Sequence, residues 1–266
     1  MCIRDRRILI FSPHPDDDVI SMGATLKLLN ENKNKIEIAY MVTGNIAVHD
    51  RNVIEYIKKR VEEEFKKIRE EMKKKEISIK RLLEYKSRVR ETEAKNTLKR
   101  LKLKNVEIRF LRLPFYETGH IIKKPISKID IQKVMKTIIE TEPELIIYPG
   151  ERADPHGTHG MCINAIKTAL KQLKMKIECW YYKGGWEEYL IHEADIIIPF
   201  NEELMKLKIK AIKEHRSQLD PLFQGLDPRP FWKRAYDRNR ENGRTLRRLG
   251  LTEKRYAELF KREKTG

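Results

Sequence analysis

The sequence lacks any long apolar run. No stretch approaches the roughly 18 to 20 consecutive apolar residues that a membrane span requires, so we expect no membrane partner. The first apolar run, residues 8–11, is too short for the core of a signal peptide and leads directly into a polar motif. We therefore expect a cytoplasmic protein.

Cysteine is also scarce. Cys2, Cys162 and Cys179 show no CxxC spacing and are too few for a disulfide framework, which agrees with a reducing compartment. We expect these thiols to have no role in function.

Acidic residues are in deficit: 57 Lys and Arg stand against 40 Asp and Glu, a net charge of +17. A positive field attracts nucleic acid, an anionic membrane or an anionic small substrate. Most of the excess lies in Lys- and Glu-rich stretches at 58–75 and 95–104, which we interpret as solvated helix faces. No zinc finger, RNP-type segment or basic heptad array accompanies the charge, so nucleic acid is disfavoured as a partner.

The first six residues, MCIRDR, read like translated sequencing-adapter sequence. We interpret residues 1–6 as artefactual, and expect the natural chain to extend further upstream.

Predicted strands and helices alternate along the chain, which is typical of a parallel sheet with crossover helices. The expected strands are 7–11, 36–42, 106–111, 144–148, 177–182 and 195–199, and the expected helices between them are 19–30, 129–140 and 160–173. This order predicts a single α/β domain over 1–266, a Rossmann-like three-layer αβα sandwich with a mostly parallel sheet. A helical hairpin, broken near 77–79, is expected as an insertion at about 52–103, and a helical C-terminal tail at about 202–266.

Two loops at the carboxyl ends of predicted strands are dense in metal-ligand and acid–base residues. The first is 13–18 (PHPDDD), directly after the first strand, and the second is 154–160 (DPHGTHG), after the fourth. Functional sites of open parallel sheets lie at this edge, so we expect the two loops to converge.

These loops offer the ligands of a catalytic zinc site, which takes three protein ligands and keeps a fourth position for water. His14 and Asp17, three residues apart, can point to one side of a turn that enters a helix, and His159 can complete the set. The same set could hold iron, cobalt or nickel.

Two further residues have roles in this interpretation. Asp16 would face the water at the metal and take its proton as the water attacks an amide carbonyl. His156, one turn before His159, would act toward the tetrahedral intermediate and the departing amine. Each motif alone is better explained as helix capping or hydrogen bonding, but six such residues at equivalent strand ends favour a site.

The motif HPDDD (14–18) followed by SMGATL (21–26), with a later HxxH, resembles the LmbE-like (PIG-L) family of zinc-dependent N-acetylglucosaminyl deacetylases. The resemblance implies the roles given above: zinc on His14, Asp17 and His159, Asp16 as general base, and His156 at the oxyanion or amine. It also implies that Arg90 contacts the sugar. The alternative is that Arg90 is a solvated charge on a helix surface. HRSQ at 215–218 is similar to a family element near the C-terminus.

The second motif departs from the HPDH that is common in the family, since Gly157 and Thr158 stand in its place. Either Asp154 supplies the carboxylate that orients His156, or His156 is less firmly held. DPHGTH, with 113–119 and 225–229, is similar to deacetylase-like modules that are joined to a glucosamine-6-phosphate deaminase-like module. An upstream partner module would fit the unusual N-terminus.

This subgroup resemblance and the basic charge suggest a small-molecule substrate, an N-acetylated amino sugar or its phosphate. Arg90 or Arg152 could bind the phosphate through forked donors, whereas Tyr116 with its neighbour Phe115 could stack on a neutral sugar. Asn45 is expected to border the pocket.

Three alternatives stay open. His49 is a weak candidate for a fourth ligand. The domain could be a non-catalytic or regulatory sugar-binding part of a larger fused enzyme, and it could form a homo-oligomer. A nucleotide-binding Rossmann module is disfavoured because no GxGxxG follows the first strand.

Overall fold

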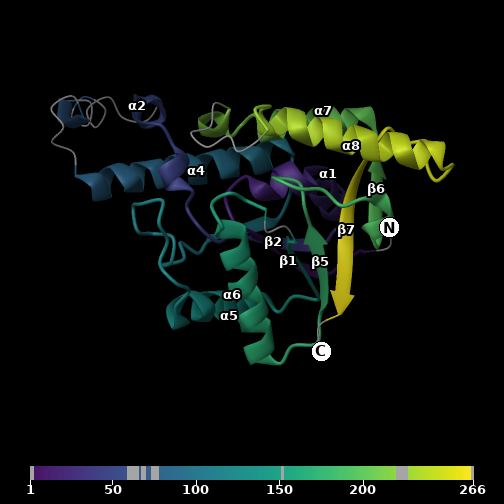
Figure 1. The fold of residues 1–266 in the computed structure, drawn as a ribbon, viewed down its shortest axis with the longest axis horizontal. Helices are drawn as coiled ribbons and strands as arrows, with labels where there is room; N and C mark the ends of the chain where they lie inside the picture. Colours follow the sequence, from purple (N-terminus) through teal and green to yellow (C-terminus); the bar gives the residue numbers. More distant parts are fainter. Residues whose placement is uncertain are drawn as a thin grey trace.

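A computed structural model describes residues 3–58, 66, 70–72, 78–150, 153–219 and 227–264. Seven strands form one sheet in the order β3-β2-β1-β4-β5-β7-β6 (Figure 1). The strands are β1 (Arg7–Ser12), β2 (Lys35–Tyr40), β3 (Val106–Phe110), β4 (Leu145–Pro149), β5 (Glu178–Tyr182), β6 (Ile196–Phe200) and β7 (Tyr256–Lys264). Strands β1 to β5 pair in parallel, and β7 is antiparallel to both of its neighbours.

Helices cover both faces of the sheet, which confirms the predicted three-layer sandwich (Figure 1). One apolar core lies between the sheet and the pair α5 (Lys128–Thr141) and α6 (Thr158–Leu173). A second core lies on the opposite face, under α1 (Asp17–Glu31), α4 (Ile79–Arg100), α7 (Glu202–Ile212) and α8 (Phe231–Arg248). Strand β1 is apolar throughout its buried part because it contributes to both cores: Leu9 and Phe11 face the first, Ile8 and Ile10 the second.

The predicted insertion contains α2 (Asp50–Lys58) and α4, which contact each other through Val53, Ile57 and Tyr85. The break expected near 77–79 corresponds to the start of α4, where the Ser78 hydroxyl accepts a hydrogen bond from the Arg81 amide at 3.3 Å. Parts of the insertion, 59–65, 67–69 and 73–77, lie outside the described residues.

The prediction of a helical tail is wrong at its end. Helices α7 and α8 are present, but the chain then returns as β7 and enters the sheet between β5 and β6. Strand β7 pairs with β5 and β6 on its two sides, and its first five residues are buried.

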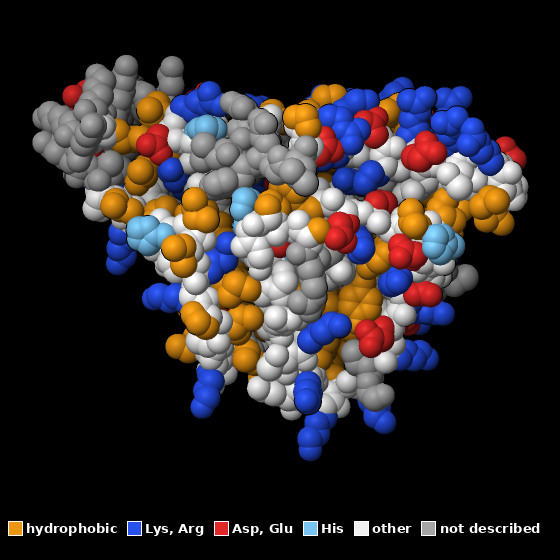
Figure 2. Space-filling model, viewed as in Figure 1, with side chains coloured by type: hydrophobic (Ala, Val, Ile, Leu, Met, Phe, Trp, Pro, Cys, Tyr) orange, Lys and Arg blue, Asp and Glu red, His pale blue; other side chains and the backbone are white. Residues whose placement is uncertain are grey.

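On the face seen in Figure 2, Lys and Arg gather at the upper right, where α8 lies, and project from the lower part, with Asp and Glu among them. Of the described helices, none combines the length and the apolar character that crossing a membrane needs.

Candidate metal centre and its cavity

The two motif loops meet at one edge of the sheet. The first follows β1 and leads into α1, and the second lies between β4 and α6. Because β1 and β4 are adjacent and parallel, their carboxyl ends open at the same edge. The predicted convergence of the two loops is therefore observed.

His14, Asp17 and His159 come together at this edge. Their candidate ligand atoms all lie within 4.8 Å of one another. One oxygen of Asp17, Oδ2, lies 3.0 Å from His14 Nδ1 and 3.1 Å from His159 Nε2. Two imidazole nitrogens and a carboxylate oxygen are ordinary zinc ligands, so the donor set fits a divalent transition metal.

Charge keeps Asp17 ionised. Burial raises the pKa of Asp17, but the charges of His159 and His14 and their hydrogen bonds outweigh this effect and bring the pKa well below its usual range. The His14 amide also donates to Asp17 Oδ2 at 2.8 Å, which fixes the turn that carries both residues. A carboxylate in this state is the form that binds a metal.

The third aspartate of the motif, Asp18, belongs to the protein interior. It is fully buried, and it accepts a hydrogen bond from the Tyr40 hydroxyl at 3.1 Å. Its amide donates to Ser12 Oγ at 3.1 Å. Burial raises the pKa of Asp18 to about 7. Asp18 therefore secures the start of α1 beneath the site.

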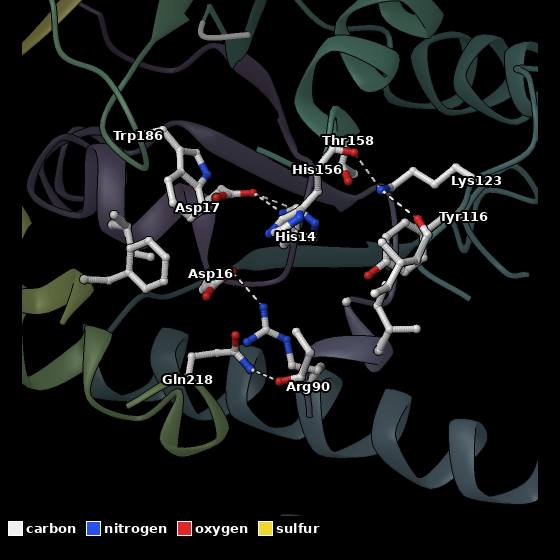
Figure 3. A pocket seen from close by; sticks show the side chains of 16 residues that line it. His14, Asp16, Asp17, Arg90, Tyr116, Lys123, His156, Thr158, Trp186 and Gln218 are labelled. Atoms are coloured by element: carbon white, nitrogen blue, oxygen red, sulfur yellow. Dashed lines mark hydrogen bonds and ion pairs between the residues drawn. The ribbon is translucent and has the colours of Figure 1, made fainter. Parts of the chain in front are cut away.

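Asp16 lies beside the metal-ligand set and is held by Arg90. Arg90 Nη2 donates to Asp16 Oδ1 at 2.7 Å, and both side chains are buried and line the same cavity (Figure 3). Arg90 is only 2% exposed, so it is not a solvated helix charge. Within the described part of the chain, its Nε and Nη1 have no hydrogen-bond partner. Buried donors of this kind are available to a ligand.

Gly44 makes room for the guanidinium. Its φ of +64° is in the left-handed region, and a Cβ built there would lie 3.2 Å from Arg90 Nε. A side chain at position 44 would thus be strained and would press on Arg90.

The 215–218 element packs against α4 and holds Arg90's helix in place. Glu93 accepts hydrogen bonds from the Ser217 amide at 2.8 Å and from its hydroxyl at 2.7 Å. His215 Nε2 lies 2.9 Å from Thr97 Oγ1. Gln218 reaches the cavity wall, so this element is close to the site as well.

His156 also lines the cavity, with its ring edge-on to Trp186 at a centroid distance of 6.2 Å. Burial lowers the pKa of His156, and the neighbouring His14 acts in the same direction. Its ring is therefore neutral over most of the physiological pH range.

Residues 9–170 match the sequence pattern of the family described as PIG-L: GlcNAc-PI de-N-acetylase. The chain belongs to the PIG-L family. The match begins in β1 and ends in α6, so it includes both motif loops.

This PIG-L chain also has a relative that matches almost all of its length. A protein of Bacteroides thetaiotaomicron, described as a glucosamine-6-phosphate deaminase-like protein, is 36% identical over 280 residues, which cover 96% of this chain. They cover 42% of the relative, so this chain spans less than half of its length.

Two solved structures share the fold at low identity. One is N,N'-diacetylchitobiose deacetylase from Pyrococcus horikoshii (18% identity, TM-score 0.58, 97% of this chain and 84% of that chain). The other is the 4-carboxy-2-hydroxymuconate hydratase GalB from Pseudomonas putida (15% identity, TM-score 0.61, 96% and 95%). Since one is a deacetylase and the other a hydratase, the fold alone does not decide the reaction.

The structure accounts for Asp154 in the unusual second motif of this PIG-L chain. Its carboxylate accepts the Thr158 amide at 2.8 Å and the His159 amide at 3.0 Å. Gly157, with φ +67°, forms the turn between them and Asp154. Asp154 thus secures the start of α6, and with it the backbone of His159.

The other predicted site residues have different outcomes. Tyr116 and Phe115 both belong to the apolar core, and Tyr116 also lines the cavity, edge-on to His14 at a centroid distance of 6.2 Å. Gly44 and Ile46 line the cavity, whereas Asn45 between them is buried and its side chain donates to Ser87 Oγ at 3.2 Å. His49 is not in the ligand group found among the described residues. Arg152 lies outside the described residues.

Several cavity residues were not predicted from the sequence: Lys123, Trp186, Gln218, Phe231 and Ile121. Trp186 follows β5, the next parallel strand, so its place at the carboxyl edge was a usable signal. Gln218 belongs to the 215–218 element that the family resemblance had already marked. Lys123 lies in a long connection between β3 and α5 and carried no comparable signal.

Proposed function

We propose that this chain is a metal-dependent hydrolase that removes the acetyl group from an N-acetylated amino sugar or its phosphate. The observation that carries the proposal is the group His14, Asp17 and His159, with ligand atoms within 4.8 Å of one another, beside the buried Asp16. Membership of the PIG-L family supports the same reaction.

The three ligand residues would hold one divalent ion, with zinc as the first candidate and iron, cobalt or nickel as others. When bound, such an ion polarises a carbonyl oxygen and makes water a better nucleophile at neutral pH. The contribution of the protein is to hold two imidazoles and one ionised carboxylate in place before the ion binds.

Asp16 is the proposed general base. It would take a proton from the attacking water, whose oxygen forms the new bond to the acetyl carbon. The carbon–nitrogen bond then breaks, and the proton goes to the amine as acetate leaves. The ion pair with Arg90 keeps the Asp16 carboxylate oriented toward the cavity and restricts the rotation of its side chain.

His156 is the proposed partner of the intermediate and the departing amine. It lies on the second motif loop and lines the same cavity as Asp16 (Figure 3). From this loop it would donate a hydrogen bond to the oxyanion or a proton to the departing amine.

Two kinds of contact support a sugar in the cavity. Arg90 offers buried N–H donors that suit hydroxyl oxygens, and Tyr116, Trp186 and Phe231 offer ring surfaces that suit the apolar face of a pyranose.

The second candidate is a non-catalytic or regulatory sugar-binding domain within a larger protein. It is favoured by one observation, that the chain covers only 42% of a relative described as deaminase-like. Binding of an acetylated sugar without acetate release from any member of a substrate panel would support it.

The decisive assay is a panel of N-acetylated sugars and sugar phosphates, incubated with metal-loaded protein and assayed for free amine. We expect Asp16→Asn to keep its metal and to lose at least about 100-fold in kcat, because general-base catalysis contributes on the order of 100- to 10,000-fold. Unchanged turnover by Asp16→Asn would exclude Asp16 as the base. Metal content, measured on the same samples, is the control.

A further inference from the structure

The two cations that line the cavity differ in their partners. Asp16 and Arg90 neutralise each other in a buried ion pair, and Asp17 is paired with two imidazoles. Lys123 is the other cation in the described lining, and no described carboxylate forms an ion pair with it. Among the described residues, Lys123 is therefore a cavity cation that forms no ion pair, although the lining as a whole has as many carboxylates as cations.

The position of that ammonium group is fixed by backbone contacts. Lys123 Nζ donates to the His156 carbonyl at 2.7 Å and to the Ile121 carbonyl at 3.5 Å. It also lies 5.8 Å from the centroid of the Tyr116 ring. Carbonyl dipoles and a ring face orient the group, but they carry no net charge to balance it.

The connection that carries Lys123 folds back beside the cavity. The Lys124 amide donates to the Phe115 carbonyl at 2.9 Å, which closes this part of the chain into a loop. The loop brings Lys123 beside His156, and Ile121 also lines the cavity. Figure 3 shows Lys123 and Arg90 on different sides of His14.

Partial burial makes the charge of Lys123 costly. Lys123 is half-buried, and burial lowers the pKa of its ammonium group, against the opposing charge of Asp154. An anion at this position would recover the lost solvation by a charge-assisted hydrogen bond. Arg90 is less suited to that role because Asp16 has already balanced its charge.

We propose that Lys123 binds the phosphate of a phosphorylated N-acetylamino sugar, while Arg90 contacts the uncharged part of the same ligand. This inference rests on the proposed function, and it narrows the substrate class from amino sugars in general to their phosphate monoesters. Lys123 is then a specificity-determining residue rather than a catalytic one.

The test compares a charged ligand with its neutral counterpart. Binding of N-acetylglucosamine 6-phosphate, N-acetylglucosamine 1-phosphate and N-acetylglucosamine is measured by calorimetry with the wild-type chain, Lys123→Gln, Lys123→Arg and Lys124→Gln. The amide of Gln keeps a hydrogen-bond donor without the charge, Arg keeps the charge, and Lys124 is the exposed neighbour. Release of free amine is followed in parallel.

We expect the wild type to prefer one of the two phosphates over N-acetylglucosamine. Lys123→Gln should weaken binding of that phosphate by about 10- to 100-fold, the usual loss for a hydrogen bond to a charged group, and change the neutral sugar by less than about twofold. Lys123→Arg should recover most of the preference, and Lys124→Gln should match the wild type.

Three results separate the possibilities. Equal weakening of charged and neutral sugars by Lys123→Gln would overturn the inference, because it would show that Lys123 only positions His156. A wild type that binds both kinds of sugar equally would overturn it too. If Lys123→Gln loses the phosphate preference but no sugar releases free amine, the anion site is supported. The proposed deacetylase activity is then contradicted.

Discussion

Arg90 shows how burial changes the meaning of a charged residue. In the sequence it is one of many basic residues in a charged helix, yet its side chain is 2% exposed and donates to Asp16 at 2.7 Å. The two remaining unpartnered nitrogens, Nε and Nη1, are buried as well. Buried donors without acceptors lower the stability of the fold. A ligand that accepts hydrogen bonds from Arg90 would remove this cost.

Arg90→Met should therefore impair catalysis more than folding. We expect kcat/KM on the best N-acetylated sugar to fall by about 100-fold, because Asp16 loses its orienting partner and the sugar loses a charged donor. Arg88→Met, two residues away and exposed, is the matched control and should stay within about twofold of the wild type. A wild-type kcat/KM in Arg90→Met would remove Arg90 from the site.

The sequence predicted the site residues that belong to a short motif, but it did not predict the cavity residues that lie outside the motifs. His14, Asp17 and His159 stand in two recognisable loops, and the structure brings them together. Lys123 and Trp186 stand outside those loops and reach the cavity only through the paths of long connections. Asn45 sits beside Gly44 in sequence, but the 3-10 turn η1 (Asn45–Ala47) directs its side chain to Ser87 instead.

Among the elements, α1 carries the metal-ligand loop and has an internal break. Met22 has φ −136° and ψ 26°, so the helix is interrupted one turn after the motif. The amides of Ala24 and Thr25 donate to the Glu258 carboxylate at 3.1 and 2.7 Å, and that carboxylate also binds Lys208 Nζ at 2.6 Å. Strand β7 and helix α7 thus together cap the second half of α1.

Removing one partner of this buried ion pair should destabilise the fold. Lys208→Met leaves the Glu258 charge buried and uncompensated, and we expect the free energy of unfolding to fall by about 3 to 5 kcal/mol. Chemical denaturation measures the change. Lys206→Met, on an exposed position of the same helix, should change it by less than about 0.5 kcal/mol. A loss below about 1 kcal/mol in Lys208→Met would show that Glu258 is satisfied without Lys208.

The contacts of β7 also explain why its prediction failed. Residues 256–264 follow a strongly basic amphipathic helix, so the local pattern favoured more helix. The strand is stabilised instead by pairing with β5 and β6 on both sides and by burial of Leu259 and Phe260. Pairing between strands that are far apart in the sequence cannot be seen in a short stretch of sequence. Such pairing overrides the local preference for helix.

For the whole molecule, the distribution of apolar residues predicted the architecture well. The first six strands and the helices between them lie within one or two residues of their expected bounds, because short apolar runs alternate with amphipathic segments. The order β3-β2-β1-β4-β5 then places the ends of β1 and β4 side by side. This adjacency of neighbouring parallel strands is what joins two loops that are more than 100 residues apart in the chain.

The central claim is that these two loops hold one divalent ion, and zinc titration of the metal-free protein by calorimetry tests it most directly. We predict one tight equivalent for the wild type and for Asp16→Asn. His159→Ala should bind zinc at least about 100-fold more weakly, since even outer-shell changes cost about 10- to 100-fold. Thermal unfolding of the same samples verifies that each variant is folded. Zinc binding by folded His159→Ala with the stoichiometry and affinity of the wild type would contradict the account.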